Sequence, residues 1–133
     1  MNDNQSQINK PNGTGIRRLF KATYCSIKGF KAAWTHESAF RQELILVLVL
    51  LPFSFVLAQS TNHWLALIFS LLFLLFAELV NSALEALADK ICLDHDELIG
   101  RAKDIGSAIV FIALIFLKLV WLIATLQYFS VIS

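Results

Sequence analysis

The chain has 133 residues, of which 57% are hydrophobic and only 16% are charged, and its net charge is +1. This length leaves room for one domain, and a composition this apolar excludes a soluble domain and indicates an integral membrane protein. The charges are segregated: of 11 Lys and Arg residues, seven precede Leu44, and three more lie in the stretch from Lys90 to Lys103. We expect no nucleic-acid partner.

The N-terminal third of the chain changes character at residue 16. Residues 1–15 are rich in Asn, Gln, Gly and Ser, and we predict that they are disordered. Over 16–36, apolar residues recur at helical spacing and basic residues fill the positions between them. A basic amphipathic helix of this kind lies on a membrane surface. We therefore predict a single membrane domain over 16–133 that begins with a surface helix at 16–36.

Three apolar stretches follow, at about 39–59, 63–90 and 105–128. As helices they approach or exceed the roughly 30 Å of a bilayer core. The turn between the first two and the tail after the third carry no Lys or Arg, unlike the N-terminal segment and the connector before the third. The positive-inside rule then places the N-terminus in the cytoplasm and the C-terminus outside. The predicted fold is an all-α membrane protein with three transmembrane helices and an N-terminal amphipathic surface helix.

A polar stripe interrupts the second span. Asn81, Glu85 and Asp89 fall within about 60° of Glu78 around a helix, and the four residues form a stripe about 16 Å long. Ionisable groups inside a span are costly and by default mark a functional site. Glu78 lies about 21 Å along the helix from Trp64, where loss of water favours its neutral form and suits a general base. A purely structural role is also open, in which a protonated glutamate hydrogen-bonds a neighbouring helix.

Further acidic residues could serve a metal ion. Glu85 and Asp89 lie one turn apart and could hold a hard cation such as Mg²⁺ through oxygen ligands. Glu37 and Glu43, at the foot of the first span, could add carboxylates from a neighbouring helix. These two acids could equally be solvated interfacial charges, with Glu43 paired to Arg41.

The connector 94–104 is polar, and its residue types suit a nucleotide. Gly100 permits a sharp turn, and Lys103 offers a point charge for a phosphate. An ordinary charged loop explains the same residues. The chain has no Gly-rich phosphate loop ending in Gly-Lys-Ser/Thr and no protein-kinase or dinucleotide fingerprint. Any nucleotide chemistry must therefore use a site unlike those of the soluble enzymes.

Several short motifs together resemble one family. The second span reads Glu-Leu-Val-Asn-Ser-Ala-Leu-Glu from Glu78, and the connector reads Gly-Arg-Ala-Lys-Asp from Gly100. Ala-Ala-Trp at 32–34 with Glu37, and Ala-Phe-Arg-Gln-Glu at 39–43, belong to the same pattern. Over about 18–121 the chain closely resembles the small bacterial diacylglycerol kinases, a family that includes undecaprenol kinases.

The resemblance implies a homotrimer in the bacterial inner membrane that transfers the γ-phosphate of ATP to diacylglycerol and gives phosphatidic acid. It implies that Glu78 is the catalytic base and that Asn81 steadies the γ-phosphate. Glu37 and Glu85 would ligate the Mg²⁺ that accompanies ATP. The nucleotide would contact Arg18, Cys25, Ser26, Glu37, Glu85, Asp94, His95, Asp96, Lys103 and Asp104. The lipid would contact Lys31, Ala32, Ala33, Trp34, Ala39, Phe40, Arg41, Gln42, Glu43, Glu78, Ser107 and Trp121.

Two positions depart from the family pattern, and three further functions stay open. Cys25 stands where the family often has Tyr, and Lys118 lies in the third span where an apolar residue is expected, so that it must snorkel outward or face the trimer interior. A polyprenol such as undecaprenol would need the same base and metal as diacylglycerol. A non-enzymatic membrane assembly held together by its carboxylates would contain the same polar residues, as would a proton or cation pathway.

Overall fold

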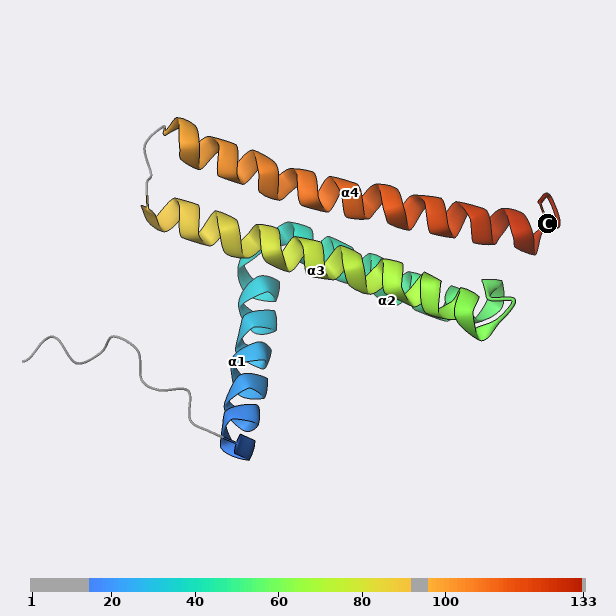
Figure 1. Cartoon of the computed structure of the whole chain (residues 1–133), viewed down its shortest axis with the longest axis horizontal. Helices are drawn as coiled ribbons and strands as arrows, with labels where there is room; N and C mark the ends of the chain where they lie inside the picture. The colour runs from blue at the N-terminus through green and yellow to red at the C-terminus, as the bar shows by residue number, and fades with distance from the viewer. Residues whose placement is uncertain (1–14, 92–95, 133) are drawn as a thin grey trace, which may run out of the picture.

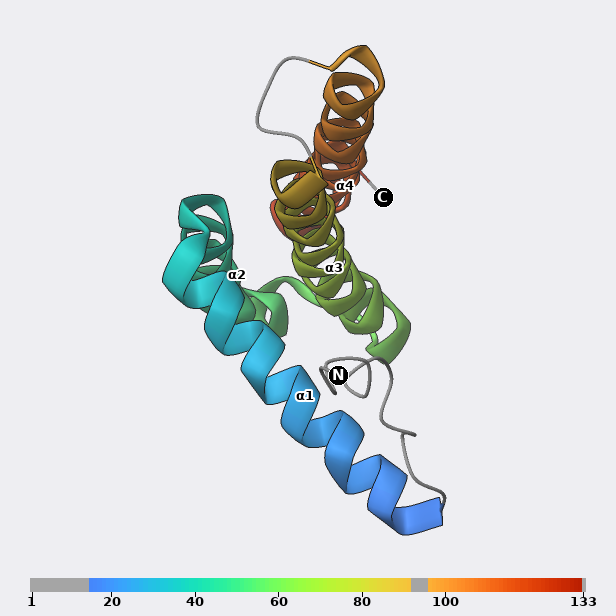
Figure 2. The same cartoon turned by 90° about the vertical axis from the view of Figure 1, so that its left-hand side faces the viewer.

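The computed structural model describes residues 15–91 and 96–132, and these form four α-helices. They are α1 (Gly15–His36), α2 (Ser38–Leu57), α3 (Thr61–Ile91) and α4 (Glu97–Tyr128). Figure 1 shows α2, α3 and α4 running side by side along the long axis, while α1 leaves the start of α2 at a steep angle. The end-on view in Figure 2 shows that α1 extends away from the bundle. The predicted disorder of residues 1–14 and the expected contacts of Asp94 and His95 lie outside the described residues. Gly15, which was also predicted to be disordered, is the first residue of α1.

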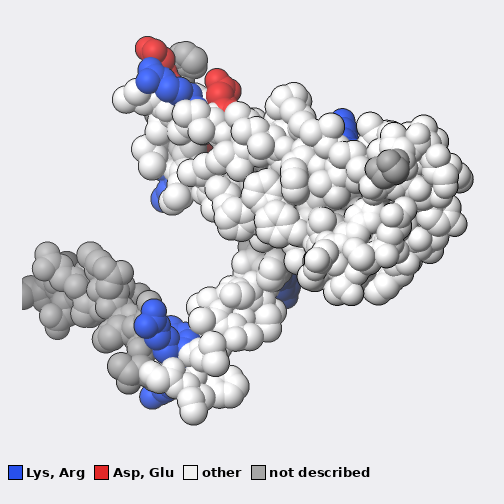
Figure 3. Space-filling view, turned by 45° about the vertical axis from the view of Figure 1, so that its right-hand side comes forward, with Lys and Arg blue, Asp and Glu red and all other residues white. Residues whose placement is uncertain are grey.

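Helices α2, α3 and α4 are long and apolar enough to cross a membrane. The prediction of an all-α membrane protein with three such helices is confirmed to this extent. Helices of 31 and 32 residues are about 46 and 48 Å long, so α3 and α4 exceed a bilayer core by roughly 16 Å. On the face drawn in Figure 3, charged side chains gather near the junction of α3 and α4 and along α1. The parts of α3 and α4 near this junction are therefore charged and suited to water outside the bilayer core.

The start of α4 differs from the prediction of a loop that ends at residue 104. The Asp96 carboxylate accepts hydrogen bonds from the backbone N–H groups of Leu98 and Ile99, at 2.9 and 3.0 Å. This side chain satisfies donors that a helix leaves unpaired at its N-terminus, so α4 begins at Glu97. Gly100 lies inside the helix and makes no turn. Residues 97–104 of the expected connector thus form the first two turns of α4.

Helix α3 is the central element of the bundle, packed against α4 on one side and α2 on the other. Ala77 of α3 and Ala113 and Ala124 of α4 are fully buried, and such small residues let helices approach closely. Larger apolar side chains fill the remaining space in the core, namely Val47, Leu67, Leu71, Leu74, Leu117 and Trp121.

Much of the apolar surface of α2 and α4 is exposed, including Leu48, Phe55, Phe111 and Leu122. Exposed apolar area on this scale is foreign to a soluble monomer and suits lipid or a second chain. Lys118 is also exposed on α4, among these apolar residues.

A single arginine joins α1 to α2. The guanidinium of Arg41 donates to the backbone carbonyls of Trp34 and Thr35, at 2.9 and 3.3 Å. These carbonyls belong to the last turn of α1, where helical acceptors lack partners. Arg41 therefore caps α1 and holds its end beside α2.

Candidate active site

The polar stripe of α3 runs from a buried acid to an exposed ion pair. Glu78 is only 3% exposed, and Asn81 is 9% exposed. The Nδ2 group of Asn81 donates to Glu85 Oε1 at 3.0 Å. One turn further, Asp89 accepts from Lys103 Nζ of α4 at 2.9 Å, and both side chains are well exposed. The stripe therefore links the interior of the bundle to its charged end over about 16 Å.

Carboxylates of α2, of α3 and of the junction between α1 and α2 lie close enough to Glu78 to interact with it electrostatically. Its charge interacts repulsively with those of Glu85 on α3, Glu37 between α1 and α2, and Glu43 on α2. The Oε2 atom of Glu43 is buried and accepts no hydrogen bond from any described residue. Unpaired like charges in a poorly solvated place are unfavourable. The group of acids is therefore stabilised by anything that brings a proton or a cation.

The donor set suits a cation only in part. Within 15–91 and 96–132, no three His, Cys, Asp or Glu side chains come together as a metal cage. Mg²⁺ does not need such a cage, because it is commonly held by one or two carboxylates together with substrate phosphates and waters. Glu37 and Glu85 both interact electrostatically with Glu78, and their carboxylates are candidate oxygen donors of this kind. The residues therefore fit Mg²⁺ carried by a polyphosphate better than a metal bound by protein alone.

Helix α4 covers the stripe at Gly106. This glycine is buried, and a Cβ atom built on it would collide with Asn81 Oδ1 and lie 3.5 Å from Leu84 Cδ1. Asn81 Oδ1 is itself buried and receives no hydrogen bond from the described part of the chain. The two helices thus touch directly beside the asparagine.

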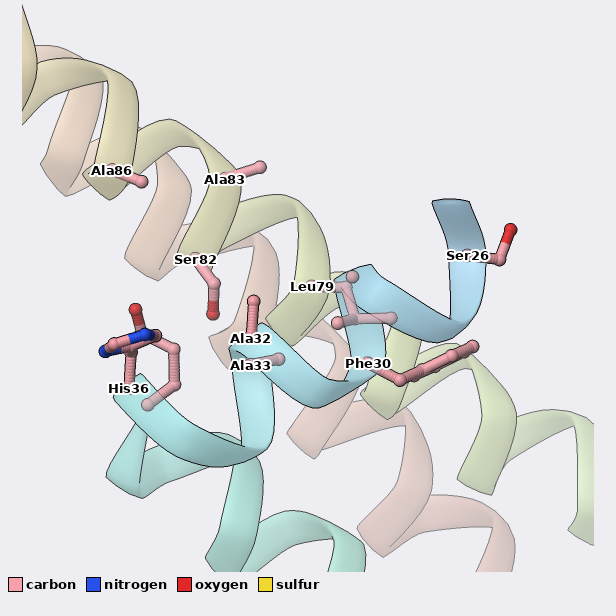
Figure 4. A pocket seen from close by; sticks show the side chains of 11 residues that line it. Ser26, Phe30, Ala32, Ala33, His36, Leu79, Ser82, Ala83 and Ala86 are labelled. Atoms are coloured by element: carbon pink, nitrogen blue, oxygen red, sulfur yellow. The ribbon is translucent and has the colours of Figure 1, made fainter. Parts of the chain in front are cut away.

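A cavity of about 510 Å³ lies between α1 and α3 (Figure 4). Ser82 points from α3 toward Ala32 and Ala33 of α1, with His36 nearby. The Ser82 hydroxyl is buried and has no hydrogen-bond partner among the residues described. The remaining wall is mostly apolar and includes Gly29, Phe30, Leu79, Ala83 and Ala86. Such a cavity suits an apolar ligand that also carries a hydrogen-bonding group.

Several predicted site residues border this region. Ser26, Ala32, Ala33 and Glu37 line the cavity, and Phe40 is buried at the start of α2. Arg41 is engaged with the end of α1. The other predicted contacts near the charged end are partly or fully exposed; they are Lys31, Trp34, Ala39, Gln42, Lys103, Asp104 and Ser107.

Other predicted site residues lie away from Glu78. Arg18 and Cys25 are exposed on α1, and Arg18 precedes Glu37 by 19 residues, or about 28 Å of helix. Trp121 follows Gly106 by 15 residues, or about 22 Å, and its indole N–H donates to Ser70 Oγ at 3.1 Å. Asp96 is occupied as the N-cap of α4. One chain alone does not bring these residues to Glu78.

Sequence reasoning assigned no site role to Ser82 or Gly106. Ser82 belongs to the motif that begins at Glu78, and Gly106 follows the motif that begins at Gly100, but their positions in the sequence do not indicate what they face. Gly106 is informative only once it is known to lie opposite Asn81, and Ser82 only once α1 is placed beside α3. Small residues at the start of a span signal close packing in general, without naming the partner.

Comparison with known proteins gives a consistent result. A model of the prokaryotic diacylglycerol kinase family matches residues 24–125. The chain is 43% identical to a diacylglycerol kinase of Haemophilus influenzae over 108 residues, covering 81% of this chain and 92% of that protein. It is 42% identical to a diacylglycerol kinase of Escherichia coli K12 over 119 residues, covering 90% and 98%. A diacylglycerol kinase of Pseudomonas aeruginosa is 42% identical over 81% of this chain and 88% of its own. The chain therefore belongs to the prokaryotic diacylglycerol kinase family.

Proposed function

We propose that this protein transfers the γ-phosphate of ATP to the free hydroxyl of membrane diacylglycerol and releases phosphatidic acid. Its family and its relatives named diacylglycerol kinase support this choice of lipid. The observation that carries the proposal is the stripe itself: the buried acid Glu78 shares one face of α3 with the hydrogen-bonded Asn81 and Glu85 and with Asp89 of the exposed Asp89–Lys103 pair. A hydroxyl from the lipid and a triphosphate from water can meet along such a stripe.

The residues divide the reaction between them. The Glu78 carboxylate takes the proton of the lipid hydroxyl while that oxygen attacks the γ-phosphorus. The bond from the γ-phosphorus to its bridging oxygen breaks, and ADP leaves with the electron pair. Asn81 has two amide N–H donors; one is held by Glu85, which leaves the other for a γ-phosphate oxygen. Lys103, oriented by Asp89, lies at the aqueous end of the stripe.

Glu37 and Glu85 are the proposed ligands of Mg²⁺ that arrives with ATP. When bound, the ion neutralises charge on the phosphates that develops during transfer. The same acids repel Glu78, so a cation on them relieves part of this repulsion. Contacts to the adenosine part are proposed for Arg18, Cys25, Ser26, Asp94, His95, Asp96 and Asp104.

The lipid is proposed to enter from the cavity side. Its glycerol region would lie in the cavity between α1 and α3, where Ser82 offers a hydroxyl and the alanines offer apolar contact. Lipid contacts are further proposed for Lys31, Trp34, Ala39, Phe40, Arg41, Gln42, Glu43, Ser107 and Trp121. In this view α1 lies on the cytoplasmic membrane surface, with its apolar side chains in lipid and its basic side chains near phosphates.

We further propose that the active unit is a homotrimer in the bacterial inner membrane, with the N-terminus cytoplasmic and the C-terminus outside. A second chain would supply what one chain lacks: cover for the exposed apolar faces of α2 and α4, and residues such as Arg18 that lie far from Glu78 in their own chain. The distribution of Lys and Arg supports the orientation.

The proposal is tested with purified protein in lipid nanodiscs, radiolabelled ATP and Mg²⁺. Diacylglycerol, undecaprenol and no added lipid form the three arms. We expect labelled phosphatidic acid in the first arm at a rate far above the other two, and loss of this product when EDTA removes Mg²⁺. A faster reaction with undecaprenol would reassign the lipid. Absence of product in every arm, with ion flux in liposomes lacking ATP, would favour the cation pathway instead.

A further inference from the structure

We propose that Gly106 is a positioning residue of the kinase reaction: the lack of a side chain at this point of α4 fixes the amide of Asn81. The inference rests on the proposed function, in which Asn81 steadies the γ-phosphate. The structure describes four glycines, at 15, 29, 100 and 106. For the first three, a Cβ atom would meet no described residue within 4 Å. Only the fourth would place a methyl group against a residue of the polar stripe.

The two ends of the Asn81 amide are constrained differently. Its Nδ2 group donates to Glu85 Oε1 at 3.0 Å, along its own helix. The Oδ1 atom consequently faces α4, where it is buried and accepts no hydrogen bond from residues 15–91 or 96–132. Nothing attracts the oxygen to this place, and it stays there because Gly106 leaves the space. This arrangement keeps the second N–H of the amide free for a substrate oxygen.

A methyl group at position 106 would force this amide to move. The Cβ atom would collide with Oδ1, and asparagine is too short to bend only its far end away. Rotation of the amide would weaken its hydrogen bond to Glu85 and turn the free N–H away from the phosphate. Displacement of a positioning group by about 1 Å can cost about 100-fold in rate.

The first experiment compares Gly106→Ala with Gly100→Ala in the nanodisc assay. Both lie inside α4, and only the first would meet Asn81. We expect Gly106→Ala to lower kcat about 10- to 100-fold with the KM for diacylglycerol unchanged, and Gly100→Ala to keep both values. An unchanged kcat in Gly106→Ala would overturn the proposal. Lack of kinase activity in the unmodified protein would instead refute the proposed function, and this is seen before any variant is made.

A second experiment separates positioning from general packing. Gly106→Ala is added to Asn81→Ser, which has no amide to displace, and we expect no further fall in kcat. An equal further fall in this background would show a packing role and overturn the proposal. If Gly106→Ala alone does not fold, the pair Gly106→Ala with Asn81→Ser should fold again, and failure of both would also overturn it.

A spectroscopic measurement does not depend on turnover. The side-chain amide signal of Asn81 is identified in NMR spectra by its loss in Asn81→Ser. We expect this signal to shift in Gly106→Ala and to stay in place in Gly100→Ala. A signal at the same position in both variants would contradict the proposal.

Discussion

The two halves of the helical bundle treat buried polar groups in opposite ways. In the half next to the α2–α3 turn, Trp64 donates to Ser54 and Trp121 donates to Ser70, each at 3.1 Å. Both serine hydroxyls in turn donate to backbone carbonyls of their own helices. In the half that contains Glu78, three buried side-chain atoms lack partners within the described chain; they are Glu43 Oε2, Asn81 Oδ1 and Ser82 Oγ.

This difference separates stability from function along one pair of helices. Buried polar groups in folded proteins are nearly always hydrogen-bonded, because leaving one unpaired is costly. The turn-side half follows that rule with side chains from different helices, so those bonds hold α2, α3 and α4 together. The half with Glu78 departs from the rule where acids of α2, α3 and the α1–α2 junction interact with one another. Its unpaired groups are available to a ligand or to another chain.

The largest expected effect concerns Glu78→Gln. Glutamine keeps the size of the side chain but cannot accept the hydroxyl proton, so we expect kcat to fall about 100- to 10,000-fold. The free energy of unfolding should rise rather than fall, since the change removes repulsion with Glu37, Glu43 and Glu85. Lipid kinase assays and unfolding in detergent measure the two quantities.

The matched control is Glu97→Gln at the start of α4. Glu97 is highly exposed and forms only a surface pair with Arg101 at 3.3 Å. We expect kcat to stay the same and the free energy of unfolding to change by no more than about 0.5 kcal/mol. If Glu78→Gln lowered stability and left kcat intact, the acid would be a structural hydrogen-bonding group and the contrast between the halves would disappear.

The sequence predicted those parts of the site that lie along one helix. Glu78, Asn81, Glu85 and Asp89 share a face because helical geometry alone determines their directions. The bond between Asn81 and Glu85 is a consequence of this same spacing. The three long apolar helices followed equally directly, since the length and composition of a span are local properties.

Features that depend on how helices pair could not be predicted from the sequence. The contact of Gly106 with Asn81 requires the register of α4 against α3, and the cavity requires the angle of α1 against α3. The early start of α4 was also missed, because the Asp96 cap competes with the turn tendency of Gly100 and outweighs it. Polar composition correctly marked this stretch as aqueous but did not determine its secondary structure.

A smaller effect is expected from Ser70→Ala, which leaves the Trp121 indole N–H without its acceptor. Hydrogen bonds between membrane helices contribute about 0.6 kcal/mol on average and up to about 1.7 kcal/mol. We expect the free energy of unfolding to fall by about 1 kcal/mol, while kcat and the KM for diacylglycerol stay the same. Trp121→Phe removes the same bond and also core volume, so it should lose more, and the double variant should lose no more than Trp121→Phe alone. Additive losses would show that the two side chains act separately.

The smallest effect on stability is expected from Ser82→Ala, twelve residues along the same helix. Its hydroxyl is as buried as that of a core residue, yet no described group bonds to it, so removal should change the free energy of unfolding by less than about 0.5 kcal/mol. The hydroxyl points into the cavity proposed for the lipid, and its loss should raise the KM for diacylglycerol about two- to tenfold, the equivalent of one hydrogen bond. Ser70→Ala and Ser82→Ala thus each remove one serine hydroxyl from α3. The first should lower the free energy of unfolding, and the second should raise the KM for diacylglycerol. If Ser82→Ala destabilised the protein as much as Ser70→Ala and kept the KM, the unpaired groups near Glu78 would serve packing between chains rather than substrate binding.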